Sequence, residues 1–269
     1  MLRLLSFIML FPAALWAATP EELGRLHTAL QTDVLMEILS EEGVEQSEDL
    51  RGEMFPGRGG FGWTATAKQI YAPERMTSLF RAAFDAELKD VDVLPLLDFY
   101  SSETGSRVAA LEVQARRAIM SDDVEAAARA AYEDIEGRGS QREELLNEFA
   151  DLNSLIDRNV AGALNANLAF YRGLGSGEGF EMTEDQMLRE VWDQEASIRD
   201  DTSGWVFGYM AFAYEPLTDE QLRSYVDLTA TDVGRDLNRA LFAGFDAVFL
   251  DVSFALGAAT ARFSVGDEL

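Results

Sequence analysis

The stretch PGRGGFGW, residues 56–63, holds glycines at the spacing Gly-x-Gly-x-x-Gly, which in some proteins cradles a dinucleotide pyrophosphate. That chemistry requires a β-strand before the loop and a helix that opens at the third glycine. The preceding residues, EQSEDLRGEMF, are acidic and contain no run of β-branched residues, and the loop holds no lysine. We therefore expect no nucleotide site here.

Both glycine-rich runs are instead interpreted as connections between helices. In residues 56–63 we expect glycines to adopt unusual dihedral angles while Phe55, Phe61 and Trp63 pack into the core. The second run, GLGSGEG at residues 173–179, is typical of a flexible connection.

The sequence limits nucleophilic and metal chemistry severely. It contains no cysteine, so thiol catalysis, disulfides and thiolate metal sites are excluded. His27 is the only histidine, so a Ser-His-Asp triad would have to be built on it, and a zinc motif with two histidines is impossible. We expect His27 to be a partly exposed residue of a helix.

Carboxylates are the remaining candidates for catalysis. Asp98 and Glu103 are the best placed, because Asp227 and Asp232 repeat them 129 residues later. General acid–base chemistry needs one of them buried with a raised pKa. A spacing of five residues, however, places two side chains about 140° apart on a continuous helix. Helix capping and solvation explain the recurrence more simply, so we assign no catalytic, cofactor-binding or metal-binding residue.

The elements that would position these residues are predicted to be helices throughout. Ser or Thr is followed three residues later by Glu or Gln, the pattern of a capping box, at Thr19, Ser140, Thr183 and Thr218. Apolar residues recur every three or four positions after these sites. The aromatic stretch WVFGYMAFAY, residues 205–214, is also predicted to be helical. The expected fold class is all-α.

The chain also contains a weak internal repeat. A shift of 129 residues places residues 88–108 over residues 217–237 with matching roles. Ser102 and Thr231 both precede a helix as N-cap residues, each followed by a carboxylate that the helix dipole favours.

Gly105 and Gly234 then fall in the first turn of their helices, where the missing side chain allows another helix to approach closely. We accordingly expect one helical domain made of two related halves, residues 18–138 and residues 139–269.

The segment LLDFYSSETGSRVAALE, residues 96–112, resembles the exported proteobacterial family labelled domain of unknown function 2059. That family is similar in having an aromatic pair, a serine, a short spacer, a glycine and an amphipathic helix; this chain has Glu103 where members usually have proline. The stretch YVDLTATDVG is interpreted as a second, more diverged copy. The resemblance implies a helical protein of the cell envelope and carries over no catalytic residue.

The first residues predict export. Arg3 is followed by an apolar run over residues 4–16 that is too short to span a membrane, and small residues then precede the first acidic residue. We expect residues 1–17 to be a signal peptide, cleaved after Ala17, and the mature chain to be periplasmic. An uncleaved N-terminal anchor is the alternative.

Charge and hydropathy restrict the partners. With 22 basic and 48 acidic residues the chain has a net charge of −26, which repels nucleic acids and anionic lipids. The apolar run at residues 240–261 is long enough to span a membrane, but Asp246 and Asp251 interrupt it. We expect a buried helix packed on both sides and no transmembrane span in the mature chain.

These features favour a non-enzymatic periplasmic protein that binds an envelope protein or a small ligand through a groove between its two halves, without a cofactor. The alternative is a carboxylate-dependent envelope hydrolase, acting for example on cell-wall glycans. A cleft that holds a buried carboxylate with a raised pKa would favour the hydrolase.

Overall fold

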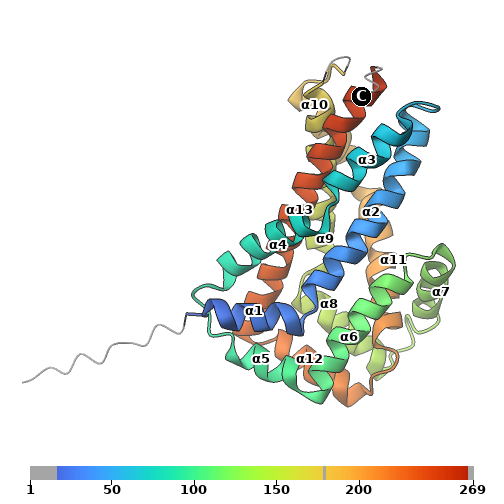
Figure 1. Cartoon of the computed structure of the whole chain (residues 1–269). Helices are drawn as coiled ribbons and strands as arrows, with labels where there is room; N and C mark the ends of the chain where they lie inside the picture. The colour runs from blue at the N-terminus through green and yellow to red at the C-terminus, as the bar shows by residue number, and fades with distance from the viewer. Residues whose placement is uncertain (1–16, 178–179, 266–269) are drawn as a thin grey trace, which may run out of the picture.

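The computed structural model describes residues 17–177 and 180–265, and in these residues the chain forms thirteen α-helices and no strand, which confirms the all-α prediction (Figure 1). Residues 205–214 are helical, as expected. The expected signal peptide, residues 1–17, lies outside the described residues except for Ala17.

The helices are α1 (Pro20–Ala29), α2 (Thr32–Met54), α3 (Gly60–Ile70), α4 (Pro73–Leu88), α5 (Leu94–Ser101), α6 (Glu103–Ala118), α7 (Asp122–Glu133), α8 (Gln141–Leu152), α9 (Leu155–Gly175), α10 (Glu184–Asp193), α11 (Glu195–Tyr214), α12 (Asp219–Thr229) and α13 (Asp232–Ser264).

Side-chain caps begin many of these helices. Complete capping boxes form at three of the four expected sites, Thr19, Thr183 and Thr218. At Ser140 the prediction was half right: its hydroxyl accepts from the Glu143 backbone N–H. The Glu143 carboxylate, however, accepts from the backbone N–H groups of Gly137 and Gly139, at 2.6 and 2.7 Å. It therefore closes the preceding turn, and these hydrogen bonds lower its pKa.

The glycine loop joins α2 to α3 and packs on the end of α13. Gly57 and Gly59 have φ angles of 77° and 79°, the left-handed region that glycine adopts readily. Phe55 and Trp63 are buried, and the Trp63 ring meets Phe263 at a centroid distance of 5.5 Å. The element before the loop is the helix α2, so the strand that a dinucleotide site requires is not there.

Two expectations about the glycine-rich runs were wrong. Phe61 is 91% exposed because it lies two residues before the buried Trp63 in α3, and a spacing of two places side chains on opposite faces of a helix. In the run 173–179, Gly173 and Gly175 belong to α9 instead of a flexible connection, and residues 178–179 lie outside the described residues.

α13 is the central helix of the fold, with its most extensive contacts to α9 and then to α4 (Figure 1). The crossing with α9 relies on glycine. A methyl group on Gly173 would collide with the backbone carbonyl of Phe254, and one on Gly257 would collide with that of Phe170. Both side chains must be absent for the two backbones to come this close.

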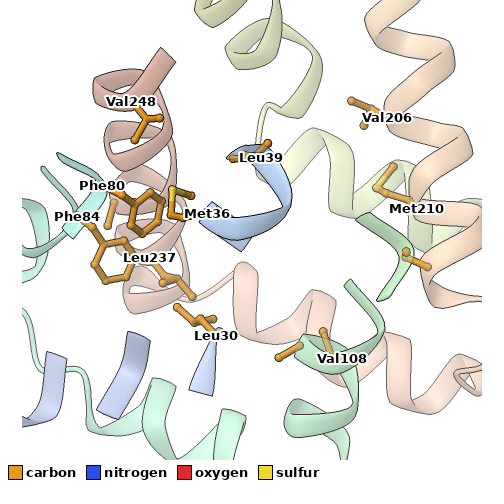
Figure 2. Close-up of a cluster of buried hydrophobic side chains, with 14 of the residues drawn as sticks. Leu30, Met36, Leu39, Phe80, Phe84, Val108, Val206, Met210, Leu237 and Val248 are labelled. Atoms are coloured by element: carbon orange, nitrogen blue, oxygen red, sulfur yellow. The ribbon is translucent and has the colours of Figure 1, made fainter. Parts of the chain in front are cut away.

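One hydrophobic core runs through both sequence halves, because α4 packs on α13 and α11 packs on α6 and α7. Figure 2 shows Phe80 and Phe84 of α4 beside Leu237 and Val248 of α13, with Met36 of α2 between them and the rest of the core.

Two helix corners, α5–α6 and α12–α13, share the same hydrogen bond. The Ser102 hydroxyl accepts from the Gly105 N–H at 3.1 Å, and the Thr231 hydroxyl accepts from the Gly234 N–H at 3.0 Å. Both expected N-caps are therefore present.

Glycine is required at both corners. A methyl group on Gly105 would collide with the backbone carbonyl of Phe99, and one on Gly234 would collide with that of Leu228. The expected close approach is confirmed, and the approaching backbone belongs to the helix that precedes each corner.

Replacing either corner glycine by alanine should destabilise the fold. Gly105→Ala and Gly234→Ala would each overpack a backbone contact, at a cost of roughly 1–3 kcal/mol in the free energy of unfolding. The control is Gly52→Ala, since Gly52 is an α2 residue with no atom near its missing Cβ. There alanine should gain up to about 1 kcal/mol. Urea unfolding measures all three, and stabilisation at a corner would contradict the packing described.

Candidate functional site

The four carboxylates singled out from the sequence do not form a catalytic pair. Asp98 and Glu103 are exposed at the α5–α6 corner, and Asp227 and Asp232 are exposed at the α12–α13 corner. Asp232 pairs with the nearby Arg235. Solvated carboxylates of this kind suit helix ends and lack the buried setting of a general acid.

His27 is buried, with 2% of its surface exposed, so the expectation of a partly exposed residue was wrong. Its Nδ1 lies 3.1 Å from the Thr32 hydroxyl and its Nε2 lies 2.9 Å from the Asp85 carboxylate of α4. The Phe84 ring covers it at a centroid distance of 4.7 Å. His27 follows Leu26 on the apolar face of α1, and a polar partner on each ring nitrogen makes its burial tolerable.

The Thr32–His27–Asp85 arrangement resembles a catalytic triad only in its residue types. Thr32 is 1% exposed, so its hydroxyl cannot meet a substrate. The network joins α1, α2 and α4, and its role is structural.

A different group, which sequence reasoning missed, carries the most unusual chemistry. Glu112 lies on the inner face of α6, and the hydroxyls of Tyr214 and Tyr225 donate to its Oε1 at 2.7 and 3.0 Å. The Tyr209 hydroxyl donates to its backbone carbonyl at 2.9 Å. With Tyr100, whose ring centroid lies 6.5 Å from that of Tyr225, these residues form what we call the Glu112 cluster.

The cluster favours protonation of its carboxylate. Burial raises the pKa of Glu112, and the hydrogen bonds from Tyr214 and Tyr225 offset only part of that effect. Glu112 retains some exposed surface as a residue, but the cluster surrounds its carboxylate. Burial, followed by the nearby Glu112 charge, raises the pKa of all four tyrosines, Tyr100, Tyr209, Tyr214 and Tyr225. The tyrosines are therefore neutral hydrogen-bond donors at physiological pH.

The Glu112 cluster does not open into either of two surface depressions. The larger, of about 410 Å³, lies between α1 and α5 and is lined by residues that include Arg25 and Ser101. The second, of about 320 Å³, lies along α10. The described residues also hold no group of three or more metal-ligating side chains. The cluster joins α6, α11 and α12, and neither of these two depressions reaches it.

One signal in the sequence could have identified Glu112. It lies four residues after the buried Val108, on the apolar stripe of α6, where an acidic residue is unexpected. Its hydroxyl donors lie on α11 and α12, about a hundred residues away along the chain, and only the tertiary fold brings them together.

Glu112→Gln should gain stability relative to the wild type as the pH rises. The folded state holds the Glu112 proton more tightly than the unfolded state, so the wild type loses stability as pH rises from 4.5, the ordinary value, through the raised folded pKa. Glutamine keeps an oxygen for both tyrosine hydroxyls and cannot ionise. Urea unfolding between pH 4 and pH 8 measures the difference.

The matched control is Glu45→Gln, an exposed position in the middle of α2. A difference between Glu112→Gln and wild type that stays flat with pH would show that the cluster does not favour the proton.

Exposed apolar side chains gather at one end of the molecule. The end of α2, the start of α3, α10 and the end of α13 lie together there (Figure 1), and Arg58 of the α2–α3 loop donates to the Ser264 carbonyl at 3.0 Å. We call the exposed apolar residues of these elements the apical surface: Met54, Phe61, Leu188, Trp192 and Val265.

α13 is not buried on both sides, so that expectation was wrong. Phe249, Leu250 and Phe254 are exposed on one face. Asp251 pairs with Arg75 of α4, while burial raises the pKa of Asp246. Within the described residues α13 is the one helix that is long and apolar enough to cross a membrane by length and composition.

The comparisons with known proteins give one match. Residues 74–134 match the family model described as "Uncharacterized protein conserved in bacteria (DUF2059)". The match runs from α4 to α7 and includes the α5–α6 corner and Glu112, so it supports the resemblance seen at residues 96–112. No curated protein matches the chain. No solved structure matches it either.

Proposed function

We propose that this chain is an exported, periplasmic, non-enzymatic protein that binds an envelope partner through the apical surface. The observation that best supports this proposal is the position of the exposed apolar residues. Phe61 of α3 is 91% exposed and Trp192 of α10 is 70% exposed, and α10 and the start of α3 lie at the same end as the ends of α2 and α13 (Figure 1). Large apolar side chains grouped on a soluble surface mark interaction sites, whereas single ones need no explanation. Aromatic residues are also enriched among the residues that dominate binding energy.

We further propose that the chain is a duplication in which α1–α6 correspond to α8–α13. The order and relative lengths of the helices support this, since α2 and α9 are the long second helices of their halves, with 23 and 21 residues. Gln31 before α2 and Ser154 before α9 share a left-handed conformation, with φ angles of 55° and 50°. Non-glycine residues rarely adopt this conformation. The shared glycine corners add to the correspondence.

Reciprocal packing supports the same proposal. α4 packs on α13 of the other half, and α11 packs on α6 in return. In this arrangement α3 and α10 are equivalent helices, so each half contributes one helix of the equivalent pair to the apical surface. A partner bound there would contact the junction of the duplicated units.

A carboxylate-dependent hydrolase is the second candidate, because Glu112 is a carboxylate with a raised pKa. A glycosidase of the usual kind needs two carboxylates flanking a substrate bond. The groups bonded to the Glu112 carboxylate are tyrosine hydroxyls, and the cluster contains no second carboxylate, which ranks this function below partner binding. Hydrolysis of purified cell-wall glycans that Glu112→Gln abolishes would reverse the ranking.

Site-specific crosslinking tests the partner proposal. A photo-crosslinking residue placed at Phe61 or at Trp192 should give a discrete adduct in intact cells. The control is Leu94, an exposed apolar residue at the start of α5, at the opposite end of the molecule (Figure 1). Equal labelling at Leu94, or no adduct at either apical position, would count against the apical surface as a binding site.

The N-terminus of the exported protein tests localisation. Mass spectrometry of the chain from the periplasmic fraction should find a mature start at Ala18, since residues 1–17 read as a signal peptide. An intact Met1 in the membrane fraction would identify an uncleaved anchor instead.

A further inference from the structure

The outer face of α10 differs from the rest of the apical surface in its charge. α10 buries Met187 and Val191 and turns Leu188 and Trp192 outward. Leu188 and Trp192 are four residues apart, so their side chains are neighbours on one face of the helix. Among the described residues no aromatic ring and no guanidinium group stacks on Trp192.

Asp185 and Asp193 lie near this apolar pair on α10. Asp185 precedes Trp192 by seven residues, two helical turns, and therefore shares its face. Asp185, Glu190 and Asp193 form no ion pair with any residue that the structure describes, whereas Glu184 pairs with Arg172. Arg189 lies on the same helix, three residues before Trp192 and four before Asp193, and is exposed. Asp185, Glu190 and Asp193 outnumber it, so α10 keeps a surplus of negative charge.

A depression lies beside the same residues. It has a volume of about 320 Å³ and is lined by Met182, Gln186, Arg189, Glu190 and Asp193. Of its two carboxylates, Asp193 directly follows Trp192, whereas Glu190 precedes it by two residues and lies on the opposite side of the helix. A guanidinium or ammonium group beside Asp193 would meet its carboxylate and, at the rim, the indole ring of Trp192, and both contacts attract a cation. Arg189 in the lining opposes this attraction, so the cation is expected on the Asp193 side of the depression.

Charge decides between the possible occupants. A second copy of this chain carries the same net charge of −26 and would be repelled, and the same repulsion applies to anionic lipid surfaces and to nucleic acids. A positively charged segment is attracted, and Leu188 and Trp192 require it to present apolar side chains as well. Only a segment with both properties complements the whole face.

We propose that the outer face of α10 docks a basic amphipathic segment of a partner protein, with a Lys or Arg side chain over Trp192 and beside Asp193. The inference rests on the proposed function and names the chemistry of the partner. Electrostatic attraction speeds the encounter, and burial of Trp192 contributes most of the affinity.

The test is calorimetric titration of the full mature chain with an 18-residue amphipathic peptide of leucine and lysine. Trp192→Ala should weaken binding by about tenfold or more, since truncated hot-spot aromatics cost that much. The double variant Asp185→Asn with Asp193→Asn should weaken binding and reduce its dependence on salt. Both positions are exposed, so unfolding midpoints near that of the wild type are expected.

Matched controls isolate the α10 face. Leu94→Ala removes an exposed apolar side chain at the other end, and the pair Glu45→Gln with Asp49→Asn removes two exposed charges from α2. Both should bind the peptide within about twofold of the wild type, because surface positions outside a binding site contribute little. A leucine–glutamate peptide of the same pattern and a lysine–serine peptide should bind far more weakly.

Equal affinity of Trp192→Ala and wild type would overturn the inference. Equal binding of the leucine–glutamate peptide, or binding to phosphatidylglycerol vesicles that depends on Trp192, would overturn it as well. If crosslinks form at Phe61 and Trp192 in cells but the purified chain does not bind the basic peptide, this inference is wrong and the proposed function is still supported. If neither the crosslinks nor binding of the basic peptide is found, both this inference and the proposed function are wrong.

Discussion

The architecture depends on backbone contacts that only glycine allows. At the α9–α13 crossing, Gly173 and Gly257 each face a backbone carbonyl of the opposite helix. At the corners, Gly105 and Gly234 face the last turn of the preceding helix in the same way. These contacts fix α13 against α9 at one end and α12 at the other, and α13 in turn holds α3 and α4. Because protein cores are closely packed, even one added methyl group at any of these four positions would overpack a helix contact. These glycines therefore restrict how the rest of the core can pack.

The different lengths of α6 and α13 explain why the two proposed halves expose different surfaces. α13 is a single helix of 33 residues, whereas α6 has 16 residues and is followed, after a break, by α7 with 12. The unbroken α13 reaches the apical end, and there Phe263 covers Trp63. In the first half the chain turns after Ile119, so α7 packs on α11 instead of continuing along α2. One half therefore extends a covering helix to the apical end and the other does not, and α10 there keeps its acidic outer face exposed.

Local signals in the sequence predicted much of this fold, and long-range ones predicted little of the site. Caps at Thr19, Ser102 and Thr231 follow from residues within one helical turn, and so do the turn glycines. The predicted burial of Phe61 was wrong because the residue at which α3 begins determines which side chains point inward. A shift of two residues along a helix moves a side chain to the opposite face. Glu112 was missed for a different reason. Its burial depends on hydroxyls that α11 and α12 supply, and no local pattern records that pairing.

The carboxylates of this chain divide into two populations with opposite roles. Glu112 is enclosed by tyrosine hydroxyls in the core that α6, α11 and α12 share, and burial raises its pKa above the ordinary value. The acidic residues of α10 are exposed to solvent. With the proposed function, stability and recognition belong to different parts of the molecule. Because Trp192 contributes to no described ring contact and α10 is held by Met187 and Val191, the proposed binding face can vary without disturbing the glycine contacts that maintain the fold.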